Sequence, residues 1–346
     1  MQALILAGGE GTRLRPLTLN TPKPIVPIAN QPFLLRQIDL LKKVGITDII
    51  LSLNYQPSAI EKVLGDGSEF GVDLRYLIEP APLGTAGAYK FAEEFLDTAT
   101  IVLNGDILTD IDLQYVVDQH RKLNSIATIV LTPVENPAAY GLVELGNNFE
   151  VLRFVEKPKA EEIATLNLNT INAGIYIFEP NILNLIPKDE KYSFEYQLFP
   201  DLLKRKEAFH GFVADDIYWL DIGTPERYLQ AHDDLMSGKI RDFEVEKFEN
   251  LEIDENAEVD DKSVIGEGCQ IKSGAKIINS VLGENVIIEE DCSISNSVIW
   301  DETIVENQTV ILHSVIGKNS RIGKNVCLSK NSILGDNTIL TDFSIS

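Results

Sequence analysis

The sequence is poor in the residues that disulfide-bonded and membrane-spanning proteins need. Among 346 residues there are three cysteines, two tryptophans and four histidines. Cys269, Cys292 and Cys327 lack the spacing of metal ligands and cannot all pair with one another, so we expect small apolar thiols in a reducing compartment. No apolar run reaches the length of a membrane span, and no signal-peptide pattern follows Met1. We therefore expect a cytoplasmic protein.

Runs of basic residues are also absent. The formal net charge is −23, so neither nucleic acid nor an anionic membrane is an expected partner. The content of 44% hydrophobic and 24% charged residues is typical of globular proteins. The length exceeds that of one ordinary core and predicts two domains. An anionic ligand would have to bind at a local positive site in this acidic chain.

Such a site is predicted near the start, where residues 4–27 read LILAGGEGTRLRPLTLNTPKPIVP. The apolar run at residues 4–6 predicts a buried strand. The strand is followed by three glycines, Gly8, Gly9 and Gly11, and then by three cations, Arg13, Arg15 and Lys23. Backbone N–H groups in a glycine turn form a concave nest for phosphate. Glycines and cations together predict a triphosphate site.

Three other interpretations of this stretch explain less. A dinucleotide-binding fingerprint would need a third glycine where Leu14 stands, and a P-loop would need a Gly-Lys-Ser/Thr sequence after the turn. A purely structural glycine turn leaves the cations without a role. The triphosphate site remains the favoured hypothesis.

Strands and helices alternate through the first two thirds of the chain. Apolar runs predict strands at residues 49–53, 74–78, 101–103 and 126–131, and helical patterns cover residues 33–44 and 85–95. This alternation predicts an α/β domain with a Rossmann-like mixed, mostly parallel sheet. Ligands of such sheets bind beyond the carboxyl ends of the strands, which is where the glycine turn lies.

The last hundred residues follow a different period. Isoleucine, valine or leucine recurs about every six residues, and a serine precedes an apolar pair every 17 or 18 residues, at Ser280, Ser297, Ser314 and Ser332. Three six-residue sides make one turn of a left-handed parallel β-helix of the hexapeptide type. The predicted organisation is a domain at residues 1–240, a connector at 241–250 and a β-helix at 251–346. Stacked coils expose edges and flat faces, so we expect a homo-oligomer formed through the β-helix.

The histidines do not form a catalytic group. His313 occupies a repeat position that is asparagine in other coils, namely Asn279, Asn296 and Asn331, so a structural role is favoured over that of a catalytic base. His120, His210 and His232 have no evident partner and are expected on the surface.

Several polar motifs have both a structural and a functional interpretation. Asn104-Gly105-Asp106 is a turn sequence, yet Asp106 could also bind Mg²⁺, which prefers carboxylates combined with phosphate oxygens. Glu156 and Lys157 could be a surface ion pair. The loop that begins at Glu79 could be a proline-stiffened connection. The helix start at Thr224-Pro225 leaves Asp221, three residues earlier, unexplained.

At this point the sequence resembles the nucleotide-sugar pyrophosphorylases, which are sugar-1-phosphate nucleotidyltransferases. Their signature G-G-x-G-T-R-L is present at residues 8–14, and their P-K-P motif is present at residues 22–24. The resemblance covers the whole chain, including the hexapeptide tail. It implies an enzyme that transfers a nucleotidyl group from a nucleoside triphosphate to a sugar 1-phosphate and releases pyrophosphate.

The resemblance also implies roles for individual residues. Arg13, Lys23, Asp106 and Asp221 would be catalytic, and the two aspartates would together hold Mg²⁺. The nucleotide would be bound by Leu6, Gly8, Gly9, Gly11, Thr12, Arg13, Glu79 and Gly84. The sugar phosphate would be bound by Gly141, Glu156, Lys157 and Asn172.

Glu79 bears on the choice of base. Family members that use uridine or thymidine nucleotides commonly have glutamine at this position, whereas a carboxylate can accept from both N1–H and the 2-amino group of guanine. Together with the hexapeptide tail and the P-K-P motif, Glu79 makes the chain resemble members that use GTP and mannose 1-phosphate. One alternative is a glucose-1-phosphate nucleotidyltransferase that uses UTP, dTTP or ATP. Another is a non-catalytic regulatory subunit that binds a nucleotide-sugar.

Overall fold

The computed structural model describes residues 1–346 except 167, 244–247, 249, 330 and 346. The chain forms two compact units. One contains Met1–Gly9 and Leu34–Trp219, and the other contains Glu10–Phe33 and Leu220–Ser346. The segment with Arg13 and Lys23 therefore clusters with the tail, which no pattern in the sequence indicates. The predicted connector at 241–250 falls largely on residues outside the description, and its boundaries stay a prediction.

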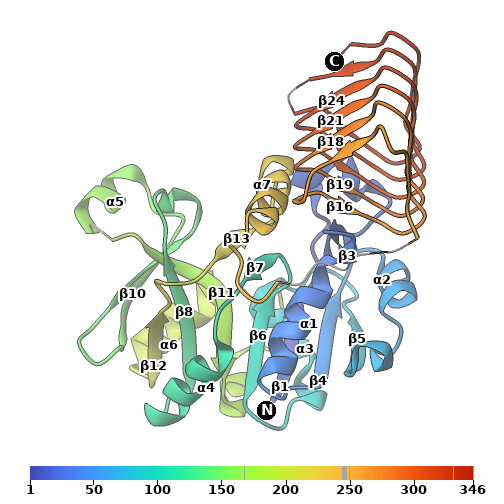
Figure 1. Ribbon diagram of the computed structural model, residues 1–346. Coiled ribbons are helices and arrows are strands. Elements are labelled where there is room, and N and C mark those ends of the chain that lie inside the picture. Colours follow the sequence, from blue (N-terminus) through green and yellow to red (C-terminus); the bar gives the residue numbers. More distant parts are fainter. Residues whose placement is uncertain (167, 244–247, 249, 330, 346) are drawn as a thin grey trace. The chain divides into compact units, whose positions relative to one another are not determined.

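The first unit is built on a mixed sheet with the strand order β10-β9-β11-β6-β1-β4-β5, with β8 pairing β11 and β12 (Figure 1). The strands β6, β1, β4 and β5 are parallel neighbours, whereas β11 runs antiparallel to β6, β8 and β9. The predicted α/β fold with a mixed sheet is confirmed. Residues Leu6 and Asn104 pair at the carboxyl ends of β1 and β6, so the two motifs that follow these strands begin at one edge of the sheet.

The strands up to the end of this unit are β1 (Gln2–Leu6), β4 (Asp48–Leu53), β5 (Asp73–Ile78), β6 (Thr100–Asn104), β7 (Ile107–Thr109), β8 (Ala127–Pro133), β9 (Gly141–Leu145), β10 (Val151–Glu156), β11 (Thr170–Phe178), β12 (Phe209–Val213) and β13 (Trp219–Asp221). The helices are α1 (Phe33–Lys43), α2 (Pro57–Leu64), α3 (Gly84–Phe91), α4 (Leu113–Lys122), α5 (Ala160–Leu166) and α6 (Phe199–Arg205), with a π-helical turn η8 (Phe194–Leu198) before α6. The helix expected over residues 85–95 ends as a 3₁₀ turn, η5 (Glu93–Phe95).

An aromatic cluster fills the core of the first unit between α3, β11 and α6. Tyr176 and Phe178 of β11 stack with ring centroids 5.7 Å apart, and Phe194 lies 5.2 Å from Tyr176 and 6.2 Å from Tyr89. Tyr176 contacts Phe199 at 5.6 Å. These rings are completely buried, and burying one contributes roughly 1.5–3 kcal/mol. The cluster makes β11 a rigid support for the polar residues at its other end.

The second unit contains a parallel β-helix, whose short strands stack in three sheets (Figure 1). The first sheet contains β14 (Glu252–Ile253), β17 (Gln270–Ile271), β20 (Ile287–Ile288), β23 (Ile304–Val305), β26 (Arg321–Ile322) and β29 (Ile339–Leu340). The second contains β15 (Glu258–Val259), β18 (Lys276–Ile278), β21 (Ser293–Ser295), β24 (Val310–Leu312) and β27 (Cys327–Leu328). The third contains β16 (Val264–Ile265), β19 (Val281–Leu282), β22 (Val298–Ile299), β25 (Val315–Ile316) and β28 (Ile333–Leu334).

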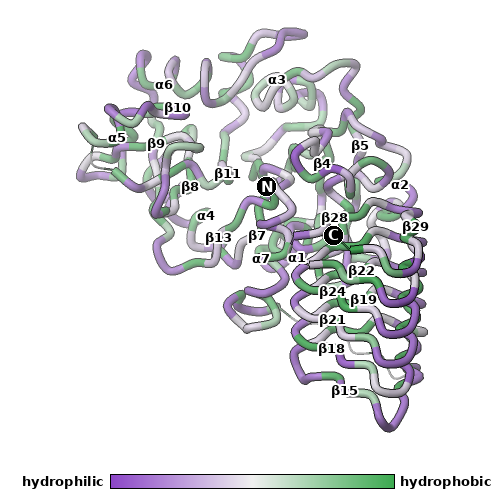
Figure 2. The backbone as a smooth tube through the Cα atoms, turned by 90° about the horizontal axis from the view of Figure 1, so that it is seen from above, coloured by the Kyte–Doolittle hydropathy of each residue, from purple (hydrophilic) through white to green (hydrophobic). Residues whose placement is uncertain are grey.

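The six-residue period is explained by the interior of the coils, where one apolar side chain per side is buried. Along each coil these apolar residues alternate with hydrophilic ones (Figure 2). The repeating serines form a buried ladder: Ser297 N donates to Ser280 Oγ at 3.2 Å, and Ser314 N donates to Ser297 Oγ at 3.1 Å. His313 has a left-handed backbone with φ 49°, as do the asparagines at equivalent positions. This position lies in the turn between two strands of a coil, where a left-handed backbone suits asparagine.

The cysteines are free thiols, as expected. Cys269 and Cys292 are buried in the β-helix, and burial raises the pKa of each thiol to about 11. The Cys269 Sγ donates to the carbonyl oxygen of Gly283 at 3.0 Å. Both thiols therefore act as core side chains.

Residues Glu10–Phe33 and the helix α7 (Pro225–Met236) complete the second unit. The segment contains the 3₁₀ turns η1 (Thr12–Leu14), η2 (Leu17–Leu19) and η3 (Lys23–Ile25), followed by a hairpin of β2 (Pro27–Ile28) and β3 (Gln31–Pro32). Ala29 and Asn30 connect the two strands with φ values of 47° and 66°, which suit a tight hairpin turn. The predicted start of α7 is confirmed, because Thr224 is its N-cap and accepts from Arg227 N.

The expectation that three histidines lie on the surface is wrong for His120 and His232. His120 is buried and contacts Thr128 Oγ1 through Nδ1 at 2.7 Å and Glu179 Oε1 through Nε2 at 3.2 Å. His232 is 1% exposed, and both of its ring nitrogens have backbone partners, Tyr228 O and Ala29 N. Glu179 and Ala29 lie 59 and 203 residues away from these histidines, so the contacts with them leave no local pattern in the sequence.

Candidate active site

Glu79 directly follows β5 and is 8% exposed. Its carboxylate accepts from Ser52 Oγ at 2.8 Å and from Leu83 N at 3.0 Å. A Cβ on Gly8 would stand 3.3 Å from Glu79 Oε1, so the glycine turn packs directly against this carboxylate. Each carboxylate oxygen has two acceptor sites, so one on each oxygen remains for a ligand.

The loop after Glu79 is held by a residue that the sequence did not indicate. Tyr192 accepts at its carbonyl oxygen from Ala86 N at 3.0 Å and from Gly87 N at 2.9 Å. A Cβ on Gly84 would stand 2.7 Å from the same oxygen, so only glycine fits there. The main chain of Gly84 is thereby fixed at the start of α3.

Asp106 lies in the turn that follows β6, next to the carboxyl end of β1. Gly105 N donates to Leu6 O at 2.9 Å, and a Cβ on Gly105 would stand 3.1 Å from Ala7 Cα. Gln37 of α1 braces the turn by donating to the carbonyl oxygens of Asn104 and Ile107 at 2.8 and 3.0 Å. Asp106 is therefore held next to the residues that precede Gly8 and Gly9.

The predicted sugar-phosphate residues converge in the first unit. Gly141 pairs with Glu156 across β9 and β10, and a Cβ on Gly141 would stand 2.7 Å from Glu156 Oε2. Lys157 follows β10 with φ 47°, and its N–H donates to Tyr140 O at 3.1 Å. Asn172 of β11 donates through Nδ2 to Tyr176 Oη at 2.8 Å. Three elements thus contribute to one polar cluster.

A bulge in β11 connects this cluster to the turn of Asp106. The register of β11 against β8 shifts between Asn172 and Tyr176, and Gly174 within the bulge has φ 74°. A Cβ on Gly174 would stand 2.7 Å from Asn104 Nδ2. Bulges commonly re-aim side chains next to functional sites. Gly174 lets the Asn104 side chain approach β11.

Glu195 belongs to this cluster, although no motif in the sequence marks it. Its Oε2 accepts from Thr85 Oγ1 at 3.0 Å and from the hydroxyl of its N-cap residue Ser193. Burial raises the pKa of Glu156, and the negative charge of Glu195 raises it further. The one sequence signal is local: Glu195 follows a serine cap in the first turn of η8.

In the second unit, Gly11 and its neighbours form a compact turn. Gly11 has φ 62°, and a Cβ there would stand 3.1 Å from Lys23 Cβ and 3.2 Å from Thr18 Cγ2. Thr18 Oγ1 donates to Gly11 O at 2.8 Å. Lys23 is 9% exposed, and Thr12 and Arg13 are exposed on η1. The turn therefore fixes the backbone that carries Arg13 and Lys23.

Asp221 lies next to Arg13 in the same unit. A Cβ on Gly223 would stand 2.9 Å from Arg13 Nη2 and 3.1 Å from Asp221 Oδ2, so both side chains flank this glycine. Asp221 also forms an ion pair with Arg227 Nη1. Arg227 was missed from the sequence, although a cation in the first turn of a helix opposes the helix dipole and so indicates a nearby anion.

Asp106 belongs to the first compact unit and Asp221 to the second. The residues that the structure describes include no group of three or more histidine, cysteine, aspartate or glutamate side chains that could hold a metal. Carboxylate oxygens are ligands that Mg²⁺ accepts, together with phosphate oxygens. The pairing of the two aspartates on one ion stays a prediction.

Residues 2–238 match the family described as "Nucleotidyl transferase". The chain belongs to this family. Curated relatives include mannose-1-phosphate guanyltransferase from Debaryomyces hansenii, which is 42% identical over 237 residues, covering 67% of this chain and 63% of the relative. Mannose-1-phosphate guanylyltransferase from Mycobacterium tuberculosis is 39% identical over 240 residues, covering 69% of this chain and 65% of the relative. The matches span less than two thirds of the relatives' own length.

Solved structures of similar proteins agree with this nucleotidyl transferase assignment. HddC from Yersinia pseudotuberculosis is 34% identical, with a TM-score of 0.57, covering 66% of this chain and 97% of that chain. A putative glucose-1-phosphate thymidylyltransferase from Bacillus anthracis is 26% identical, with a TM-score of 0.62, covering 71% of this chain and 98% of that chain. In both cases the similarity covers about as much of the chain as the family match does.

The tail of this nucleotidyl transferase has a family match of its own. Residues 244–344 match the domain described as "EIF2B subunit epsilon LbH domain". The match confirms the prediction of a left-handed β-helix after the transferase region. In the part of the chain that the structure describes, no helix has both the length and the apolar character needed to cross a membrane.

Proposed function

We propose that the protein transfers the GMP moiety of GTP to mannose 1-phosphate, forming GDP-mannose and pyrophosphate. The observation that carries this proposal is the contact between the Glu79 carboxylate and the glycine turn at Gly8. The names of the curated relatives, which are mannose-1-phosphate guanyltransferases, support it. HddC, for which a structure complexed with GMP-PN is known, supports a guanine nucleotide.

Recognition of guanine would use the acceptor capacity that Glu79 retains. Ser52 and Leu83 each occupy one acceptor site, and they fix the plane of the carboxylate without filling it. Guanine presents N1–H and the 2-amino group side by side, so each carboxylate oxygen can accept one of these hydrogens. Uracil and thymine offer one such donor between two acceptors. A carboxylate fixed in this way therefore favours guanine.

The sugar would bind at the cluster of Glu156, Asn172 and Glu195. Carboxylates accept hydrogen bonds from sugar hydroxyls, and Glu195, fixed by its bond from Thr85, provides a second acceptor besides Glu156. Gly141 leaves space beside Glu156, because any side chain there would overlap its carboxylate. Lys157, held by its backbone bond to Tyr140, would bind the sugar phosphate.

The proposed reaction is an in-line displacement at the α-phosphorus. An oxygen of mannose 1-phosphate attacks, the bond to the β-phosphate breaks, and pyrophosphate leaves. A phosphate monoester is largely dianionic at neutral pH, with a second pKa of about 6, so no general base is required. Arg13 and Lys23 would bind the triphosphate and stabilise the charge of the leaving group. Asp106 and Asp221 would hold Mg²⁺, which supplies further charge neutralisation on the phosphates when bound.

A pyrophosphate-release assay tests the proposal. GTP, UTP, dTTP and ATP are each combined with mannose 1-phosphate and glucose 1-phosphate, and we expect the pair of GTP and mannose 1-phosphate to have the highest kcat/KM. Turnover of glucose 1-phosphate with dTTP would instead favour the thymidylyltransferase alternative, which the similarity to the Bacillus anthracis structure motivates. Binding without turnover for every pair would favour a regulatory subunit.

Asp106→Asn provides the mechanistic control. We expect Mg²⁺-dependent pyrophosphate release to fall by on the order of a hundredfold or more, with an unchanged melting temperature. Turnover like that of the wild type would contradict the metal role of Asp106.

Self-association through the β-helix is part of the proposal. Ile278 and Leu312 are 47% and 40% exposed on the outer face of β18 and β24, two coils apart. Apolar residues on a flat outer face favour contact with a second copy. Light scattering of the wild-type protein and of the double variant Ile278→Ser/Leu312→Ser tests this proposal. A monomeric wild-type protein would exclude the oligomer.

A further inference from the structure

One residue interrupts the repeat of the β-helix. The position directly after each strand of the third sheet, here called the corner position, is occupied by Gly266, Gly283, Trp300, Gly317 and Gly335. A Cβ on Gly283 or on Gly317 would stand 2.6 Å from a backbone nitrogen of the next coil. Glycine is therefore the residue expected at this corner, and a tryptophan calls for an explanation.

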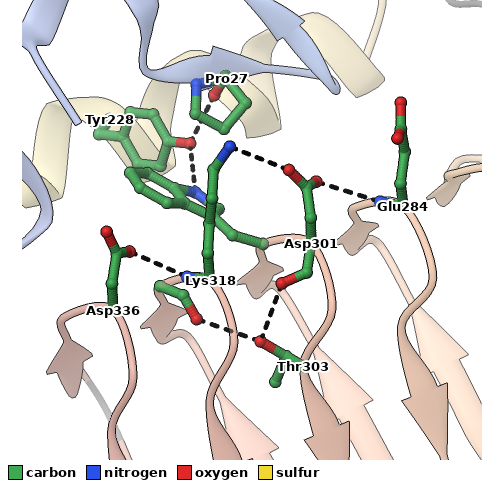
Figure 3. A network of polar contacts seen from close by, with 9 residues as sticks. Pro27, Tyr228, Glu284, Asp301, Thr303, Lys318 and Asp336 are labelled. Atoms are coloured by element: carbon green, nitrogen blue, oxygen red, sulfur yellow. Dashed lines mark hydrogen bonds and ion pairs between the residues drawn. The ribbon is translucent and has the colours of Figure 1, made fainter. Parts of the chain in front are cut away.

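The Trp300 side chain is buried against α7. Its Nε1 donates to Tyr228 Oη at 3.0 Å, and the two rings meet edge to face with centroids 6.4 Å apart (Figure 3). The Tyr228 hydroxyl donates in turn to Pro27 O. Trp300, Tyr228 and Pro27 thus form a buried chain of hydrogen bonds from the β-helix through α7 to the hairpin that follows Lys23.

Two further contacts join the β-helix to the segment Glu10–Phe33. Asn30 Nδ2 donates to Leu282 O at 2.7 Å. A Cβ on Gly335 would stand 3.1 Å from Pro16 Cβ, so this corner packs on the proline. The segment is therefore held on both sides of Lys23, by the coils at Pro16 and Asn30 and by α7 at Pro27.

Neighbouring polar groups keep the corner positions rigid. Asp301 Oδ2 forms an ion pair with Lys318 Nζ at 3.0 Å, and Asp336 Oδ1 accepts from Lys318 N at 2.9 Å (Figure 3). Asp336 also receives a hydrogen bond from the Asn20 side chain. The coils therefore present a fixed surface to the segment Glu10–Phe33.

We propose that Trp300 and Tyr228 are positioning residues for nucleotidyl transfer, and that the β-helix is the support that orders the segment carrying Arg13 and Lys23. This inference rests on the proposed function. Neither Trp300 nor Tyr228 would touch the substrate. They act through the backbone of the segment, where the contact of Gly11 with Thr18 and Lys23 transmits any displacement. Ordering of the cations before the reaction lowers its entropic cost.

Three variants test the anchor. Trp300→Gly restores the repeat residue and leaves the coil compatible with its neighbours. Trp300→Phe keeps a ring but removes the Nε1 donor, and Tyr228→Phe removes the shared hydroxyl. Ile339→Ser, at an exposed position of β29, is the matched control in the β-helix. Each protein is compared by hydrogen exchange and by kcat and KM with GTP and mannose 1-phosphate.

We expect Trp300→Gly to lower kcat about tenfold while leaving the KM for mannose 1-phosphate within about a factor of two, because an ordering effect acts on the reacting triphosphate. Amides of the segment Glu10–Phe33 should exchange faster, whereas those of the coils keep their protection. Tyr228→Phe should shift both readouts in the same direction, Trp300→Phe should retain part of the activity, and Ile339→Ser should match the wild type.

Unchanged exchange of the segment in both Trp300→Gly and Tyr228→Phe would overturn the proposal, as would loss of protection throughout the coils. Faster exchange of the segment with unchanged kcat would overturn the positioning role. An inactive wild type combined with faster exchange of the segment in Trp300→Gly would support the anchor and reject only the proposed function.

Discussion

Arg227 forms an ion pair with Asp221, and this pair places a positive charge on a carboxylate that is a proposed metal ligand. The guanidinium comes from the first turn of α7, and its backbone N–H is engaged by the cap residue Thr224. A metal ion and Arg227 would therefore compete for the same carboxylate.

Arg227→Gln should lower the concentration of Mg²⁺ that gives half-maximal activity, by roughly threefold, because it removes a competing charge close to the site. The measurement is a Mg²⁺ titration of pyrophosphate release at saturating substrates. Arg205→Gln, which removes an exposed ion pair with Asp201, is the control and should leave the titration unchanged. A higher Mg²⁺ requirement for Arg227→Gln would mean that the arginine orients Asp221 and does not compete.

Glu79→Gln should reduce discrimination between GTP and UTP. The amide oxygen of glutamine can keep one of the two existing hydrogen bonds, but the second carboxylate acceptor becomes a donor. Loss of a charge-assisted bond costs about 1.5–3 kcal/mol, so kcat/KM with GTP should fall by roughly ten- to a hundredfold relative to UTP. Glu69→Gln, an exposed position, is the control. An unchanged ratio would show that Glu79 does not recognise the base.

Gly223→Ala should reduce activity more than stability. The new Cβ would stand 2.9 Å from Arg13 Nη2, and the end of a flexible side chain can move aside at little cost. The displaced guanidinium would no longer serve the triphosphate, so kcat should fall by about tenfold or more. The free energy of unfolding, measured by thermal denaturation, should change by less than about 1 kcal/mol. A large loss of stability with normal kcat would contradict this role for the glycine.

His232 should make the protein less stable in mild acid. Burial lowers the pKa of His232 to about 4, and the ring donates through Nδ1 to Tyr228 O and accepts at Nε2 from Ala29 N. The unfolded chain, with an ordinary histidine pKa of 6.5, binds the proton more readily. The free energy of unfolding should therefore fall as the pH drops from 6.5 toward 4, by on the order of 3 kcal/mol.

Chemical denaturation at several pH values measures this slope, with His232→Gln for comparison. His120 and His210, whose pKa values are also lowered by burial, remain in the variant. The difference between the two slopes therefore isolates His232. Equal slopes would show that its titration is not linked to folding.

The fold was largely predictable because its signals are local. The apolar runs at 49–53 and 101–103 and the cap at Thr224 are read from neighbouring residues, and the six-residue period repeats along the whole tail. The structure confirms these elements. The placement of Glu10–Phe33 with the tail was not predictable, because it depends on contacts such as Asn30 with Leu282, which are far apart in the sequence.

The candidate site was predictable only where a motif marks it. Gly8, Asp106 and Glu156 lie in short signatures, whereas Glu195 and Tyr192 act through partners about a hundred residues away. Trp300 does leave a signal, since it is the tryptophan in a position otherwise occupied by glycine. That signal appears only when the coils are aligned with one another.

The residue at the corner position also determines the register in which α7 packs against the stacked coils. Adjacent coils present nearly equivalent packing surfaces, so a helix such as α7 could pack against the stack in a register shifted by one coil. The Trp300 indole fixes this register, because it is the coil of Trp300 that donates a hydrogen bond to Tyr228. Insertion or deletion of one whole coil before Trp300 would keep the stack intact and yet shift its alignment with α7.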